Sequence, residues 1–154
     1  MGICIVMFVF FSFNKTAVGS ILGFTPGRLM PWQFVTANFL HSSFNHLLFN
    51  MLGLFMFGCA VEKALKERGF LVYYAVCGIG SFLFTYLLYL VGILPNAIYI
   101  GASGALYGLL VAYSLFFPKE KILLFSVMPM QAKWTALIFG GIEFLLAFRH
   151  DGIN

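Results

Sequence analysis

Residues 41–63 read HSSFNHLLFNMLGLFMFGCAVEK, a polar opening followed by a long apolar run and a charged end. The apolar part, 44–61, approaches the roughly 20 residues that a helix needs to cross a bilayer. His46 and Asn50 are four residues apart, so in a helix they lie on one face, one turn apart. Polar side chains at membrane depth are costly, and this pair therefore marks a candidate functional site.

The composition of the whole chain agrees with a membrane location. The 154 residues are 62% hydrophobic and 9% charged, and their mean hydropathy is +0.97. A soluble domain is typically about 45–50% apolar and about 25% charged. We therefore predict an all-α, polytopic membrane helix bundle that forms one domain over residues 1–154, in contact with the lipid bilayer. The net charge is +4, but no basic cluster stands alone, so we expect no nucleic-acid partner.

Five apolar stretches predict five membrane spans, at about 2–22, 44–61, 70–94, 101–117 and 133–148. The first apolar run is short, so its helix either continues past Lys15 or is already under way where the sequence starts. A signal peptide is not expected, because the N-terminus lacks a basic region and a small-residue cleavage site. The three cysteines lie in apolar runs and are predicted to be free packing residues rather than a disulfide or a zinc site: Cys4, Cys59 and Cys77.

The basic residues of the connections predict an orientation. One set of connections holds Lys63, Lys66, Arg68, Lys119, Lys121 and Lys133. The other set holds Lys15, Arg28 and Arg149. Because basic residues are enriched in cytoplasmic loops, 62–69 and 118–133 are predicted to face the cytoplasm. The first loop, about 23–43, then faces outside.

The fourth span opens with YIGASGALYG, residues 99–108, which places Ser103 among glycines. Counted from the cytoplasmic lysines at about 1.5 Å per residue, Ser103, His46 and Asn50 all lie roughly 20–26 Å along their helices. They can therefore share one level, in a pocket sunk below the outer membrane surface. Ser103 would lie in the first turn of its helix, where free backbone N–H groups can hold an oxyanion.

Plainer interpretations of the same residues remain open. Ser103 can be a small packing residue in a contact between helices. His46 and Asn50 can simply form hydrogen bonds across helices, and Tyr107 can belong to the core. Glu143 is an acid within the fifth span for which we expect a structural rather than a catalytic role.

The stretch 41–63, together with GASGALYGLL at 101–110, resembles the rhomboid intramembrane serine proteases. The family pattern H-x4-H-x3-N corresponds here to His41, His46 and Asn50, and the G-x-S-G pattern begins at Gly101. The segment PMQAKWTALIFGGIEFLLAF, 129–148, is similar to the fifth helix of a bacterial branch of that family. The likeness runs from about Pro31 to the end of the chain.

The resemblance implies a six-helix bundle, an active site that opens to the outside, and hydrolysis of peptide bonds in or near transmembrane segments of substrate proteins. Ser103 would be the nucleophile, and His46, Asn50 and the Ser103 N–H would form the oxyanion hole. Four further residues would support the site: Gly101, Gly104, Tyr107 against the imidazole of the base, and His41 as a structural histidine. The mechanism uses no cofactor and no metal. A location in the bacterial inner membrane is expected.

The family's general base is a histidine on a sixth helix, and these 154 residues contain five predicted spans. We therefore expect a chain that stops short of that helix and, as it stands, lacks the Ser–His dyad. His150 beside Asp151 is a less favoured base. The rival function is a rhomboid-like protein that binds transmembrane segments without cutting them. A small transporter or channel is disfavoured, because neither inverted repeats nor a polar pore stripe is seen.

Overall fold

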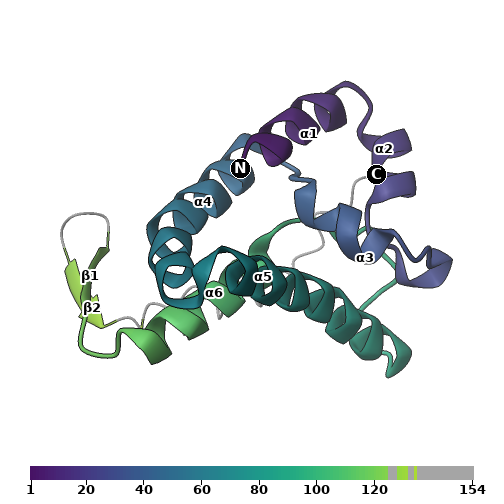
Figure 1. The fold of residues 1–154 in the computed structure, drawn as a ribbon. Coiled ribbons are helices and arrows are strands. Elements are labelled where there is room, and N and C mark those ends of the chain that lie inside the picture. The colour runs from purple at the N-terminus through teal and green to yellow at the C-terminus, as the bar shows by residue number, and fades with distance from the viewer. Residues whose placement is uncertain (125–127, 132–133, 135–154) are drawn as a thin grey trace.

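The computed structural model describes residues 1–124, 128–131 and 134. Apart from Trp134, the predicted fifth span lies outside the described residues, and Glu143, His150 and Asp151 lie outside them too. The described chain is mainly helical, as the composition predicts (Figure 1).

The predicted first span, 2–22, is not one continuous helix. Helix α1 covers Gly2–Phe13 and helix α2 covers Lys15–Leu22. Asn14 separates them with an extended backbone, φ −151°, and its side chain accepts a hydrogen bond from the Ala17 N–H at 3.1 Å. Asparagine is a favoured N-cap because its side-chain oxygen satisfies a free N–H of the first turn. The polar residue at position 14 therefore ends one helix and starts the next in a new direction.

The first loop is ordered by short helices and by its own core. It contains a 3₁₀ turn at Pro26–Arg28, helix α3 at Gln33–Thr36 and a second 3₁₀ turn at Ala37–Phe39. The ring of Phe24 packs against Phe34 at 5.0 Å and against Phe82 of the following long helix at 5.1 Å. Phe24 and Ala37 are fully buried in this cluster. The loop is thus anchored to the helical bundle.

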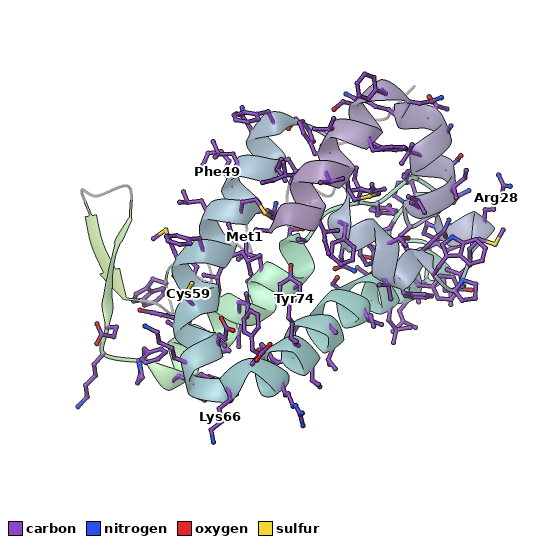
Figure 2. The ribbon with its side chains drawn as sticks, turned by 45° about the horizontal axis from the view of Figure 1, so that its top comes forward. Met1, Arg28, Phe49, Cys59, Lys66 and Tyr74 are labelled. Carbon is purple, nitrogen blue, oxygen red and sulfur yellow. The ribbon has the colours of Figure 1, made fainter. Side chains whose placement is uncertain are left out.

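The stretch that includes 41–63 forms one continuous helical run with a sharp corner. Helix α4, Phe44–Gly53, passes through a π-helical turn, Leu54–Gly58, into helix α5, Cys59–Leu90. Lys66 breaks the run with φ 60° and ψ 162°, and the α4 and α5 arms diverge from a corner marked by Lys66 (Figures 1 and 2). The predicted connection at 62–69 is therefore a corner centred on one residue rather than a loop.

This helical run is also the candidate membrane-spanning segment. Within the described residues, Phe44–Leu90 is the single helical segment long and apolar enough to cross a membrane, and its apolar 18-residue window has a mean hydropathy of 1.8. Each arm on either side of Lys66 is roughly 33–36 Å long at about 1.5 Å per residue, against a hydrocarbon core of about 30 Å. Helix α1 and the helix at Ser103–Phe116 are apolar but shorter. The count of five spans stays a prediction.

Helix α6, Ser103–Phe116, occupies the predicted fourth span and packs along α5. A side chain at Gly104 would collide with Ser81, and one at Gly108 would collide with Cys77. The Tyr73 hydroxyl donates to the Gly108 carbonyl at 2.7 Å. Small residues allow this close approach, as expected between membrane helices.

Two smaller outcomes complete the fold. Cys4, Cys59 and Cys77 are free, as predicted. The predicted connection after α6 contains a short antiparallel hairpin, in which β1, Lys121–Leu124, pairs with β2, Met128–Gln131. The hairpin lies at the edge of the bundle, beyond α6 (Figure 1).

Candidate active site

The candidate site is centred on Gly101, where α4 meets the start of α6. A Cβ atom added to Gly101 would lie 2.7 Å from Nε2 of His46 and 3.7 Å from Oγ of Ser103. The imidazole and the hydroxyl therefore flank the same point. Gly101 also has φ +126°, a conformation that residues with a side chain rarely adopt. The sequence thus places a glycine where both the backbone angle and the available space require one.

The loop before Ser103 is held by the first loop. Phe24 and Tyr99 exchange two backbone hydrogen bonds, at 3.0 and 2.8 Å, and the Gly101 N–H donates to the Ala37 carbonyl at 2.9 Å. The Gly27 N–H donates to Oδ1 of Asn96 at 2.8 Å. These contacts fix the path of the chain into α6. Sequence reasoning did not identify them, because they join residues far apart in the chain and most of them use backbone groups.

The start of α4 orients His46. Ser43 caps the helix, since its hydroxyl accepts from the His46 N–H at 3.2 Å. The hydroxyl of Ser42 lies 3.2 Å from Nδ1 of His46. With Nδ1 on Ser42, the other ring nitrogen, Nε2, faces Gly101. The HSS stretch therefore serves as a cap and as a partner for the imidazole.

His41 lies directly behind His46. Its side chain is fully buried, and its ring meets that of His46 edge to face at 5.0 Å. Burial, helped by the neighbouring imidazole of His46, lowers the pKa of His41 to about 4. The buried ring at this position contacts His46, and the structural role expected of His41 stays a prediction.

Asn50 lies one turn further along α4 and is buried. Its amide donates to the His46 carbonyl at 2.8 Å, and its Oδ1 has no hydrogen-bond partner in the described part of the chain. Three residues on, Gly53 packs against Leu106, which itself lies three residues after Ser103. Asn50 and Ser103 thus occupy matching positions on two packed helices. The second N–H of the amide remains available as a donor.

The first turn of α6 supplies backbone donors. Ala102 is the N-cap residue, and no side chain of the described residues caps this helix. Ser103 is half-buried, and its hydroxyl has no side-chain hydrogen-bond partner among the described residues. Free N–H groups at a helix start favour negative charge, so an oxyanion formed beside Ser103 would be stabilised there.

The remaining predicted site residues lie around this centre. Gly104 sits in the α5–α6 contact rather than in the pocket. Tyr107 is 39% exposed on α6, and its expected contact with the imidazole of the base stays a prediction. Sequence reasoning overlooked Lys15 as a neighbour of the site: its ammonium lies 3.5 Å from the Ser42 carbonyl.

A family model described as the Rhomboid domain matches residues 28–152, which covers the first loop, α4, α5, α6 and the region beyond. The chain belongs to the rhomboid family. The match includes the whole Gly101-centred site and agrees with the resemblance found in the two sequence motifs.

Two relatives support the assignment. The chain is 42% identical over 79 residues to Rhomboid-like protein 11, chloroplastic, of Arabidopsis thaliana, covering 51% of this chain and 26% of that protein. It is 34% identical over 116 residues to Putative rhomboid protease YdcA of Bacillus subtilis (strain 168), covering 70% of this chain and 55% of that protein. The chain therefore spans about half or less of the length of the relatives that it matches.

Proposed function

We propose that this rhomboid is an intramembrane serine endopeptidase that cleaves peptide bonds in or near the transmembrane segments of other proteins. The observation that supports this most is the meeting of His46 and Ser103 at Gly101, in the first turn of an uncapped helix. Two further facts agree: the chain belongs to the rhomboid family, and one relative is named as a putative rhomboid protease.

In the proposed reaction, the Ser103 hydroxyl attacks the scissile carbonyl and forms a serine ester, which water then hydrolyses. The negative charge that develops on the carbonyl oxygen is stabilised by the Ser103 N–H, by His46 and by the free N–H of Asn50. A single donor of this kind typically lowers the barrier by about 2.7–4 kcal/mol. The short α6 keeps the reaction centre below the membrane surface, where a substrate segment arrives from the side.

A serine needs a positioned base to act as a nucleophile. Among the described histidines, His41 is fully buried behind His46, and His46 is assigned to the oxyanion hole. We assign the base to a histidine outside the described residues. The substitution His150→Ala tests the less favoured alternative, since it removes cleavage only if His150 takes that part.

The substrates are membrane proteins, and the family is membrane-integral. We propose that Ser103 lies at the outer end of the bundle and that the corner at Lys66 lies at the cytoplasmic end, as the basic residues of the connections indicate. The bacterial inner membrane is the proposed location. The relative from Bacillus subtilis supports a bacterial origin.

Cleavage of a model transmembrane substrate in proteoliposomes tests the proposal, with the protein prepared with every residue that its gene encodes so that the histidine that acts as base is present. We expect two products, with the cut located by mass spectrometry in or next to the membrane segment. Substrate that is bound but remains intact would contradict the proposal and would favour a rhomboid-like protein that binds without cutting. A soluble unfolded protein, supplied at the same concentration, is the control and should be cut far more slowly.

A further inference from the structure

In the described part of the chain, Lys15 places a cation against the candidate site on the α2 side. The Lys15 ammonium donates to the Ser42 carbonyl at 3.5 Å, and the Ser42 hydroxyl contacts the His46 imidazole at 3.2 Å. Lys15 and Ser42 are both exposed. The ammonium is therefore one residue removed from the imidazole that faces Ser103, and incoming molecules can reach it.

The charge of Lys15 is not neutralised within the described part of the chain. The carboxylates there belong to Glu62 and Glu67, beside the corner at Lys66, and to Glu120, beyond the far end of α6. None of them pairs with Lys15. The first turns of α4 and α6 meet at the same place and add the partial positive charge of helix N-termini. The mouth of the site is thus positively charged.

We infer that Lys15 selects substrates that carry an acidic side chain, Asp or Glu, close to the scissile bond. The inference rests on the proposed protease function and names a specificity for it. The ammonium is linked to the region of Ser103 through Ser42 and His46, so it lies a few side-chain lengths from the reacting hydroxyl. An extended chain covers this distance in roughly three to five residues, which sets the position of the acidic side chain.

The size of the effect follows from the exposure of Lys15. An exposed pair of opposite charges contributes little, so a neutral substrate residue in place of Asp lowers kcat/KM by about fivefold at most. A substrate with Lys in place of Asp is repelled by Lys15, so its kcat/KM should be lower than that of the neutral substrate. Raising the ionic strength weakens the preference, since salt screens exposed charges over a Debye length of about 10 Å at 0.1 M.

The test compares three versions of one transmembrane substrate, with Asp, Asn or Lys three to five residues from the cut, in liposomes of a zwitterionic lipid. The wild-type protein should cleave the Asp substrate fastest and the Lys substrate slowest, and Lys15→Glu should reverse that order. Lys119→Glu is the matched control: Lys119 is an exposed lysine beyond the opposite end of α6, and its variant should keep the wild-type order.

The outcomes separate the two proposals. If Ser103→Ala cleaves as fast as wild type, the protease function assigned to this site is wrong. If cleavage requires Ser103 but its rate is the same for the Asp, Asn and Lys substrates, the protease function is supported and the inference about Lys15 is overturned. The inference is also overturned if Lys15→Glu changes activity only when anionic lipid is added, because the ammonium would then act on a lipid headgroup.

Discussion

Replacing Gly101 by alanine tests the geometry of the site with the smallest possible change. The new methyl group would lie 2.7 Å from Nε2 and 2.8 Å from Cε1 of His46, where ordinary contacts are about 3.5 Å or longer. His46 must therefore move by roughly 1 Å, and a displacement of this size can cost about 10²-fold in rate. Alanine is also strained at φ +126°, which costs on the order of 1–3 kcal/mol of stability.

Two measurements on Gly101→Ala separate these effects. Substrate cleavage in proteoliposomes should fall by about 10²-fold or more in kcat/KM, and thermal unfolding in detergent should show a decrease of about 2–4 °C for each kcal/mol lost. Gly80→Ala in α5 is the matched control, because a Cβ there meets no atom within 4 Å. It should leave kcat/KM nearly unchanged and should raise the unfolding temperature slightly, because alanine favours a helix interior more than glycine does. Wild-type kcat/KM in Gly101→Ala would refute the placement of His46 and Ser103 around this residue.

Three further predictions follow from single residues. Asn50→Ala should slow turnover by about 10²-fold through the loss of one oxyanion donor. Labelling of Ser103 by a fluorophosphonate should stay close to the wild-type level. Unchanged turnover would show that Asn50 is not part of the oxyanion hole. The pKa of His41 is about 4 in the folded protein and about 6.5 in the unfolded chain. Between these two pH values the unfolded chain binds more protons than the folded protein. The free energy of unfolding should therefore decrease as pH falls from 6.5 towards 4. His41→Gln should show a smaller decrease over that range in thermal unfolding, and an equal one would exclude His41 as a source. Lys66→Gly should raise the unfolding temperature by a few degrees, because glycine adopts φ 60° without strain. The control Lys63→Gly lies in regular helix and should lower the unfolding temperature. Equal changes in the two variants would mean that the backbone of Lys66 is not strained.

The site motifs were predictable because their residues are close in sequence or at fixed helical spacing. His46 and Asn50 follow the i, i+4 rule on α4, and counting residues along the helices put Ser103 at their level. In the structure both His46 and Ser103 lie close to Gly101, and their roles stay a prediction. The packing of α6 on α5 through Gly104 and Gly108 was not predicted, because the sequence does not show which helix faces these glycines.

Other features depend on interactions that no local pattern displays. The Asn14 side chain caps α2 at the break between α1 and α2. The residues on either side are so apolar that the sequence predicted one continuous span over 2–22. The corner at Lys66 places a positive φ on a residue that normally favours helix, so the sequence gives no glycine or proline as a warning. The contact between Lys15 and Ser42 joins residues 27 positions apart and depends on the direction that α2 takes after Asn14.

The central claim is that Ser103 is the nucleophile. Cleavage of a model transmembrane substrate by the wild-type protein and by Ser103→Ala, in the same proteoliposomes and at equal amounts of folded protein, tests it most directly. Ser114→Ala on the same helix is the control, since Ser114 bonds only to the Val111 carbonyl, far from Gly101. Loss of cleavage in Ser103→Ala, with Ser114→Ala at the wild-type rate, is the predicted result. Cleavage by Ser103→Ala at the wild-type rate would contradict it.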